Sequence, residues 1–323
     1  MKSGGPHILV IGAGSIGRRH ALNLTKVGAM VDITDPQPGK AEQAPAGRAV
    51  PFCAGDIGSY DGVVVASPTA AHGEQALLAL ATGAKVLVEK PLALSGDKGK
   101  EVVDVGGDRV MVGYNLRLHQ PLQRFIKAVG DGDVGEVLAA SVWFGSYLPD
   151  WRPDTDYRAT YSARADLGGG VILDAVHELD ILIWLFGDQL EMVGALVERV
   201  GRLEIDVEDT VKVLMRHAGR VPIELSLDYL SRRFRRGLEV IGSKATARLD
   251  WARAVLEIED GHGVRVERAD VPISQSYERE ASLFVDWIDD RSRPPVDGPT
   301  ALQSLRLADL IRAAAAKSDN KPL

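Results

Sequence analysis

The sequence is poor in cysteine and in long apolar runs, and its positive charges are fewer than its negative ones. Its one cysteine, Cys53, can form neither an intramolecular disulfide nor a cysteine-based metal cluster, which fits a reducing compartment. No apolar run is long enough to cross a bilayer, and no apolar signal region precedes the first strand-like segment. We therefore expect a cytoplasmic protein that does not associate with membranes.

The charge balance argues against nucleic-acid binding. The 323 residues include 38 Lys and Arg against 45 Asp and Glu, which gives a net charge of −7. A nucleic-acid partner would need a local basic surface that works against this balance. The run Arg232–Arg236 is one such surface. We interpret it as an exposed turn or strand edge, with contact to a phosphate or to a neighbouring subunit as the alternative.

The first 118 residues alternate short apolar runs with helix-like segments, and the chain, 45% hydrophobic, has material for two cores. The apolar runs are His7–Ile11, Met30–Asp35, Gly62–Ala66, Lys85–Val88 and Arg109–Gly113. Such continuously apolar strands are typical of a parallel sheet that is covered on both faces. The alternation predicts a doubly wound α/β domain, the Rossmann fold, over residues 1–118.

The pattern changes after residue 118. Apolar residues then recur with a period of two, at Val211, Val213 and Met215 and again from Val221 to Leu227. This period predicts an antiparallel or mixed sheet with one covered face, whose other face meets water, ligand or another subunit. With helices expected near residues 121–129, 277–289 and 299–315, we predict a second α/β domain over residues 119–323.

A glycine-rich turn follows the first strand and opens an amphipathic helix. In the segment Gly12–Gly17, Gly12 permits a tight turn, Gly14 lets the backbone approach a pyrophosphate, and Gly17 allows the helix to pack closely on the sheet. The first helical turn, with Ser15 and Ile16, offers free N–H groups to an anion. The alternative is a glycine turn without a ligand, which this context disfavours.

An acidic residue ends the second strand. A carboxylate at Asp35 would accept hydrogen bonds from both ribose hydroxyls and repel a 2′-phosphate, which favours NAD over NADP as the cofactor. The alternative is that Asp35, followed by Pro36, only starts a turn.

Two further motifs carry titratable groups. The tripeptide Glu89-Lys90-Pro91 ends a predicted parallel strand, at the edge where ligands bind, and a lysine there can hydrogen-bond a substrate hydroxyl and share its proton. Asp174 and His177 follow three glycines in a predicted helix through Phe186, where a histidine beside an aspartate can accept a proton. Each of these motifs alone also fits a structural role. A zinc site would need further ligands, and the sequence has no HExxH motif.

Together these motifs resemble the Gfo/Idh/MocA oxidoreductase family, named for glucose–fructose oxidoreductase and inositol dehydrogenase. The resemblance covers nearly the whole chain and rests on the order and spacing of five segments: Gly12–His20, Ala66–His72, Glu89–Pro91, Gly113–Arg117 and Gly168–His177. It implies a Rossmann domain followed by an α/β domain with a large, mostly antiparallel sheet, which in this family commonly mediates dimers or tetramers.

The resemblance also implies roles for single residues. Lys90 matches the catalytic lysine, and Asp174 and His177 match the Asp and His of the second domain. The residues implied along the cofactor are Ser67, Pro68, Thr69 and His72, with Glu89 and Asn115 near its nicotinamide end. Many members space the Asp and His by four residues rather than three, which leaves open whether His177 or Lys90 accepts the proton.

The resulting hypothesis is an enzyme that moves a hydride between NAD(H) and a secondary hydroxyl of a sugar, polyol or nucleotide (amino) sugar, in surface-polysaccharide biosynthesis if a narrower resemblance around residues 147–158 holds. Residues expected to contact this substrate, by stacking on a sugar ring or by holding a carboxylate or phosphate, are Arg117, Trp151, Arg152, Tyr157 and Arg158. Each could instead be a surface or subunit contact. The alternative functions are an NAD-dependent glycosidase of the same fold and a non-catalytic dinucleotide-binding regulator.

Overall fold

The computed structural model describes residues 5–51, 57 and 60–318, so Cys53 lies outside the described residues. The chain forms two compact units: Met1–Leu118 with Ile273–Leu305, and His119–Pro272 with the residues from Arg306 onward. A boundary between the two units lies after Leu118, the position that the sequence predicted. The structure differs from a continuous second domain over residues 119–323, because Ile273–Leu305 returns to the first unit.

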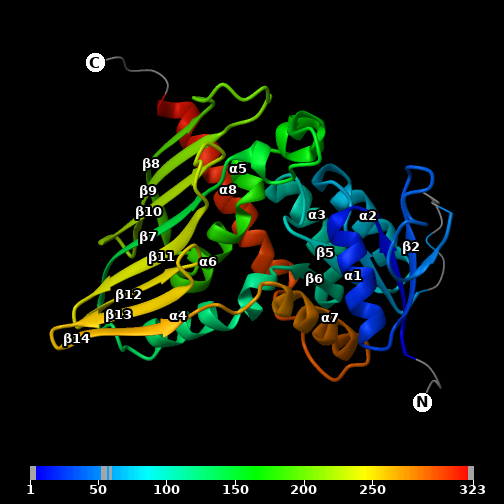
Figure 1. Cartoon of the computed structure of the whole chain (residues 1–323), viewed down its shortest axis with the longest axis horizontal. Coiled ribbons are helices and arrows are strands. Elements are labelled where there is room, and N and C mark those ends of the chain that lie inside the picture. The colour runs from blue at the N-terminus through cyan, green and yellow to red at the C-terminus, as the bar shows by residue number, and fades with distance from the viewer. Residues whose placement is uncertain (1–4, 52–56, 58–59, 319–323) are drawn as a thin grey trace. The chain divides into compact units, whose positions relative to one another are not determined.

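The first unit is built on a parallel six-stranded sheet, seen edge-on among the blue and cyan elements of Figure 1. Its order is β3-β2-β1-β4-β5-β6, and every adjacent pair is parallel. The strands are β1 (His7–Ile11), β2 (Met30–Thr34), β3 (Arg48–Ala49), β4 (Gly62–Val65), β5 (Lys85–Glu89) and β6 (Val110–Gly113). The strand order reverses between β1 and β4, and ligands of doubly wound folds bind outside the carboxyl ends of the strands at such a switch point.

Helices cover this sheet and supply the rest of its core. They are α1 (Ser15–Lys26), α2 (Thr69–Ala81), α3 (Gly96–Gly106), α7 (Ser274–Ile288) and the start of α8 (Gly298–Ser318). Helix α7 buries Ala281, Phe284 and Trp287 in one cluster with Ile8 and Val10 of β1. This burial is the physical reason why the late segment returns to the first unit.

The second unit is built on an eight-stranded sheet of order β14-β13-β12-β11-β7-β10-β9-β8. Only the β7–β10 pair is parallel, so the prediction of a mostly antiparallel sheet is confirmed. The strands are β7 (Val137–Gly145), β8 (Leu190–Glu198), β9 (Thr210–His217), β10 (Val221–Asp228), β11 (Arg235–Gly242), β12 (Ala245–Asp250), β13 (Val255–Asp260) and β14 (Gly263–Arg268). The residues predicted to face the core, such as Val213 and Leu225, are buried.

The helices of this unit include α4 (Gln120–Gly130), α5 (Val171–Asp174) and α6 (Val176–Phe186). The prediction of one continuous helix through Phe186 is wrong, because the backbone leaves the helical region at Ala175, with φ −94° and ψ 29°. The two helices are anchored separately: Asp174 accepts a hydrogen bond from Tyr229, and Glu178 of α6 pairs with Arg236 of β11. These separate anchors account for the break.

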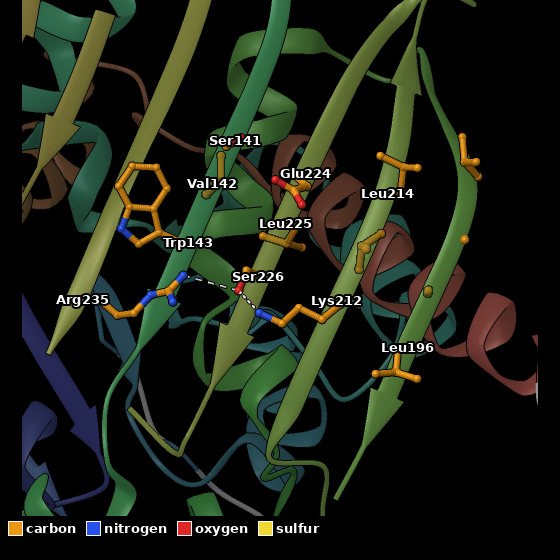
Figure 2. A pocket seen from close by; sticks show the side chains of 14 residues that line it. Ser141, Val142, Trp143, Leu196, Lys212, Leu214, Glu224, Leu225, Ser226 and Arg235 are labelled. Carbon is orange, nitrogen blue, oxygen red and sulfur yellow. Dashed lines mark hydrogen bonds between the residues drawn. The ribbon is translucent and has the colours of Figure 1, made fainter. Parts of the chain in front are cut away.

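The sheet of the second unit leaves apolar side chains exposed on its outer face. Val193, Leu196 and Leu214 are each about half exposed. Figure 2 shows Lys212, Ser226 and Arg235 on the same face, where Ser226 accepts hydrogen bonds from both cations at the edge of a hollow of about 680 Å³. Among the described residues, no helix is both long and apolar enough to span a membrane.

Candidate functional site

The turn between β1 and α1 has the shape of a phosphate-binding cradle. Gly12 has φ +102°, and a Cβ there would lie 2.6 Å from the carbonyl oxygen of Ala66. A Cβ on Gly17 would lie 1.8 Å from the carbonyl oxygen of Gly12. Gly14 immediately precedes α1, and a Cβ on it would meet nothing within 4 Å. Gly12 and Gly17 are therefore required by close packing, whereas Gly14 leaves open space in front of the helix N-terminus, as a bound pyrophosphate needs.

Asp35 lies directly after β2, beside this turn. Its Oδ2 accepts a hydrogen bond from the Ala13 N–H at 2.8 Å, and its Oδ1 accepts one from the Gln37 N–H at 2.9 Å. The Lys40 ammonium lies 3.6 Å from the same carboxylate. The carboxylate is thus held at the edge of the glycine turn, so the structure brings Asp35 together with residues 12–17.

The turn between β4 and α2 carries the next predicted cofactor residues. Pro68 caps α2 and Thr69 begins it, while the Ser67 hydroxyl donates to Gln75 at 2.7 Å. His72 is buried, and its two ring nitrogens lie 2.7 Å from the Pro91 carbonyl oxygen and 2.8 Å from that of Ser67. Burial lowers the pKa of His72. Its ring therefore ties the β4–α2 turn to the segment that carries Lys90.

Glu89 ends β5 inside a buried cluster of three titratable side chains. The Nε2 atom of His20, on α1, lies 2.6 Å from Oε1 of Glu89. A carboxyl oxygen of Glu280, on α7, lies within 4.8 Å of a ring nitrogen of His20 and of a carboxyl oxygen of Glu89. The space for Glu89 exists because position 113 is glycine, where a Cβ would lie 3.2 Å from the Glu89 carboxyl group. An N···O separation of 2.6 Å is that of a hydrogen bond, shorter than the roughly 3 Å or more between two ligands of one metal ion.

The two carboxyl groups of this cluster differ in charge. Burial opposes ionisation of Glu89, but the hydrogen bond and charge of His20, with the charge of Lys90, hold the pKa of Glu89 below its usual range. Burial, and then the charge of Glu89, raise the pKa of Glu280 well above its usual range. One carboxylate and one neutral carboxylic acid result, as expected when two such groups share a buried site.

Lys90 follows this cluster at the end of β5. Its backbone N–H donates to Glu89 Oε2 at 3.1 Å, its side chain is partly exposed, and the Lys90–Pro91 peptide bond is cis. Asn115 is buried in the 3-10 helix η2 (Asn115–Leu118), and its Nδ2 donates to Ser276 of α7 at 2.7 Å. Arg117, a predicted substrate residue, lies in the same short helix and is partly exposed.

In the second unit, Asp174 ends α5 and is held by a tyrosine. The Tyr229 hydroxyl donates to Asp174 Oδ2 at 2.6 Å. A second tyrosine, Tyr161, begins a 3-10 helix of the same unit. Burial, followed by the charge of Asp174, raises the pKa of both tyrosines above the usual range. His177 is buried in the first turn of α6. The break at Ala175 separates the two predicted catalytic residues, so they do not share one helix face.

The predicted substrate residues of this unit divide into two groups. Trp151 packs edge-on against Tyr229 at 5.3 Å, and the Arg152 guanidinium lies 5.7 Å from the centre of the Tyr161 ring. Trp151 therefore contacts the tyrosine that binds Asp174, and Arg152 contacts Tyr161, whose pKa is raised in part by the charge of Asp174. Tyr157 instead accepts a hydrogen bond from the Glu204 N–H, and Arg158 pairs with Asp156 and Glu204. The contacts of Tyr157 and Arg158 thus point to a different surface, a hollow of about 460 Å³ that Arg158 lines.

The arginine run is divided as well. The guanidinium of Arg232 lies 3.6 Å from the centre of the Tyr147 ring, and Arg232 and Arg233 precede β11, as an exposed turn would. Arg236 is inside β11 and forms a buried pair with Glu178, at 2.7 Å between Nε and Oε1. The interpretation as an exposed turn is therefore wrong for Arg236, because its charge compensates a glutamate that is 1% exposed.

Comparison with known proteins adds to this geometry. Residues 7–114 match the model of an oxidoreductase family with an NAD-binding Rossmann fold, and residues 122–248 match that of the GFO/IDH/MocA C-terminal domain. The chain belongs to the Gfo/Idh/MocA family. It is therefore an NAD-binding enzyme of the dehydrogenase and reductase class, as the resemblance predicted.

Curated relatives of this Gfo/Idh/MocA enzyme act on sugars and sugar derivatives. Inositol 2-dehydrogenase of Acidothermus cellulolyticus is 30% identical over 96% of this chain and 91% of the relative. The 1,5-anhydro-D-fructose reductase of Ensifer adhaerens is 27% identical over 79% of this chain and 78% of the relative. The crystal structure of the WlbA dehydrogenase from Bordetella pertussis with NADH and UDP-GlcNAcA shares the fold, with a TM-score of 0.83 at 22% identity over 100% of this chain and 99% of that chain.

The motifs that define the family do not contain every residue of the site. Glu280, Tyr161 and Tyr229 were not singled out in the sequence, because each reaches its partner from a distant segment. The available signals were weak: an acidic residue among the apolar positions of α7 for Glu280, and a tyrosine directly after a buried strand for Tyr229.

Proposed function

We propose that this Gfo/Idh/MocA enzyme oxidises a secondary hydroxyl of a sugar, polyol or nucleotide (amino) sugar with NAD, or reduces the corresponding ketone with NADH. The observation that carries the proposal is the open cradle at Gly14 beside the carboxylate of Asp35. It fits a dinucleotide without a 2′-phosphate, because Asp35 would accept the ribose hydroxyls and repel an added phosphate.

NAD, when bound, supplies the hydride acceptor, and the protein supplies position and charge. The first turn of α1, with Ser15 and Ile16, holds the pyrophosphate. Ser67, Pro68 and Thr69 border the cofactor. His72, Glu89 and Asn115 are given a supporting role in this proposal. His72 hydrogen-bonds Pro91, and Glu89 hydrogen-bonds His20, so both fix the segment that carries Lys90. Asn115 donates to Ser276.

Three residues carry the proton chemistry in this proposal. Lys90 hydrogen-bonds the substrate oxygen and stabilises the negative charge that develops on it, an effect that is largest where water is excluded. The hydroxyl proton passes to His177 or to Lys90. Asp174 orients His177 or the substrate. Trp151 and Arg152 are the favoured substrate contacts, because Trp151 packs on Tyr229, which holds Asp174, and Arg152 packs on Tyr161, on whose hydroxyl the charge of Asp174 acts.

The sheet of the second unit is proposed to join subunits into a homodimer or homotetramer. The half-exposed Val193, Leu196 and Leu214, which line one hollow, support this proposal, since contiguous apolar surface is characteristic of interfaces. Replacing Leu214 by Lys should shift the molar mass in light scattering toward the monomer. An unchanged mass would argue against this face, and Val264→Lys, on an exposed edge strand, is the control.

The enzyme proposal is tested by NADH formation against polyols, free sugars, amino sugars and nucleotide sugars, with NAD and NADP in parallel. We expect a substrate-dependent signal with NAD that falls by about two orders of magnitude or more in Lys90→Met. NAD affinity should be retained. Lys98→Met, on the surface of α3 and paired with Glu101, is the matched control and should keep full activity.

Three outcomes would change the proposal. Near-full turnover in Lys90→Met would remove Lys90 from the reaction. Release of sugar that needs NAD but yields no net NADH would identify a glycosidase. A signal that prefers NADP would contradict the role given to Asp35.

A further inference from the structure

The segment that follows β7 runs beside the segment that follows β10 in the second unit. The two strands pair in parallel, so both end at the same edge of the sheet. Beyond that edge the Ser146 N–H donates to the Asp228 carbonyl oxygen at 3.1 Å, and the Leu148 N–H donates to that of Tyr229 at 3.1 Å. The Tyr229 hydroxyl holds Asp174. The two segments therefore lie next to the carboxylate that the proposed function places at the substrate.

A row of aromatic side chains connects the surroundings of Asp174 with the turn before β11. Trp151 packs edge-on against Tyr229, at 5.3 Å between ring centres, and against Phe144 at 5.8 Å. Phe144 in turn packs edge-on against Phe234 at 6.3 Å. Phe144 is buried, whereas Phe234 is about half exposed. The row thus leads from the tyrosine that binds Asp174 to an aromatic ring that a ligand can reach.

A buried carboxylate fixes the turn between these two ends. The Oδ1 atom of Asp228 accepts hydrogen bonds from the Leu230 N–H at 3.0 Å and from the Ser231 N–H at 2.7 Å. Its Oδ2 atom accepts one from the Ser231 hydroxyl at 3.0 Å. Gly145 permits this arrangement, because a Cβ there would lie 2.6 Å from the Ser231 hydroxyl oxygen. The backbone that leads to Arg232 is therefore preorganised.

Arg232 carries a positive charge at this turn. Its guanidinium lies 3.6 Å from the centre of the Tyr147 ring, on the neighbouring segment. A guanidinium that stacks on an aromatic ring keeps its N–H donors at its edge, in the fork that matches two phosphate oxygens. Within the part of the chain that the structure describes, neither Arg232 nor Arg233 forms an ion pair, whereas Arg236 pairs with Glu178. The charge of Arg232 is thus available to an anion.

We propose that Arg232, stacked on Tyr147, determines substrate specificity by holding a phosphate group of the substrate. This inference rests on the proposed function and narrows its substrates to a nucleotide-linked sugar or a sugar phosphate, in place of a free sugar or polyol. These two sources of phosphate differ at Phe234. A nucleotide brings a base that can pack on this half-exposed ring, whereas a sugar phosphate brings none.

The site acts on binding and not on the chemical step. A phosphate that takes no part in hydride transfer contacts Arg232 equally in the ground state and in the transition state. Loss of such a contact raises KM and leaves kcat unchanged. For a phosphorylated substrate we therefore expect Arg232→Gln to raise KM by about tenfold or more, the value of a hydrogen bond between charged groups.

The direct test is a calorimetric titration with inorganic pyrophosphate and with uridine diphosphate. The protein is first saturated with NAD, so that the cradle at Gly14 is occupied. We expect both probes to bind, and Arg232→Gln to weaken each by about tenfold or more. Arg232→Lys keeps the charge without the planar fork and should recover part of this affinity. If NAD does not bind, the same comparison is made without it.

Two further variants refine the titration. Arg202→Gln is the matched control and should bind both probes as wild type does. Arg202 is an exposed arginine that forms no ion pair with another described residue and lines the hollow of about 460 Å³. Phe234→Leu distinguishes the sources of phosphate: a loss of about threefold for uridine diphosphate alone would identify a nucleotide-linked sugar. Unchanged binding of both probes would identify a sugar phosphate.

Three results would overturn the inference and leave the proposed hydride transfer intact. The first is wild type that binds neither probe, or binds both as tightly as Arg232→Gln does. The second is an active enzyme whose kcat/KM for its phosphorylated substrate is unchanged in Arg232→Gln. The third is an oligomer that dissociates in Arg232→Gln while both probes still bind, which would assign Arg232 to a subunit contact. Conversely, wild type without activity on any substrate would overturn the proposed function, while probe binding that depends on Arg232 would still support the phosphate site.

Discussion

Glu280 is the buried acid whose charge the structure opposes most clearly, and its replacement by glutamine gives a sharp prediction. The side chain is 1% exposed, and its Oε2 has no hydrogen-bond partner within the described residues. Burial and the charge of Glu89 raise the pKa of Glu280 well above the usual range. Glutamine keeps the shape of the neutral acid and cannot ionise.

The sign and size of the effect follow from proton linkage. A carboxyl group whose folded-state pKa is raised stabilises the fold below its unfolded pKa of about 4.3, and this contribution is lost as pH rises toward the folded pKa. One proton changes the free energy of unfolding by about 1.4 kcal/mol per pH unit. Between about pH 5.5 and about pH 7.5, wild type should therefore lose stability relative to Glu280→Gln as pH rises, at up to about 1.4 kcal/mol per pH unit. Glu89, whose pKa is lowered, is present in both proteins and cancels to first order.

The assay is urea unfolding of both proteins across this range, followed by circular dichroism. Glu278→Gln is the matched control, because Glu278 lies two residues away on α7 with a half-exposed side chain that is 3.8 Å from Lys26. The difference between wild type and Glu278→Gln should stay constant with pH. If the difference between wild type and Glu280→Gln is equally constant, Glu280 ionises normally in the folded protein and the reasoning about the cluster is refuted.

Three further changes have expected outcomes. Asp35→Ser should weaken NAD binding by about tenfold and reduce the preference over NADP in a binding titration, because the hydrogen bonds to a charged acceptor are lost while Lys40 remains. Gly17→Ala should lower the free energy of unfolding by about 1–3 kcal/mol, whereas Gly14→Ala should keep stability and weaken NAD binding, since only the first Cβ meets backbone. Glu178→Gln should cost about 3–5 kcal/mol in urea unfolding by leaving Arg236 without its buried partner, against less than about 1 kcal/mol for Glu101→Gln in an exposed pair.

The parallel sheet was predictable because its strands are continuously apolar. Runs such as Gly62–Val65 are buried along their whole length, and the glycine turn fixes where the first helix starts. Strands β8 and β14 escaped prediction for the opposite reason. Their residues are mostly exposed or half-exposed, so no buried face marks them, and their pairing partners define them. The break at Ala175 was also hidden, because the apolar stripe continues across it.

The site was predictable wherever local sequence sets local geometry. The cradle at Gly12–Gly17 and the position of Asp35 depend on one strand, one turn and one helix. The partners of Asp174 and Glu89 depend on contacts between segments 55 and 69 residues apart. Such contacts leave no periodic signal in a single sequence. Residue types alone therefore identified the charged side chains of the site. The partners that hydrogen-bond these side chains could be identified only from the three-dimensional structure.

The contact between His20 and Glu89 links the two halves of the cofactor-binding unit. Helix α1 presents its N-terminus at Gly14, and between one and two turns further along the same helix His20 meets Glu89 at 2.6 Å. Glu89 in turn accepts the backbone N–H of Lys90 at 3.1 Å. Two consecutive hydrogen bonds thus join the helix of the phosphate cradle to the strand end that carries Lys90. His20 and Glu89, which form the first of them, are nearly inaccessible to water. Because the neutral Glu280 adds no second negative charge there, Glu89 can remain ionised and keep both hydrogen bonds.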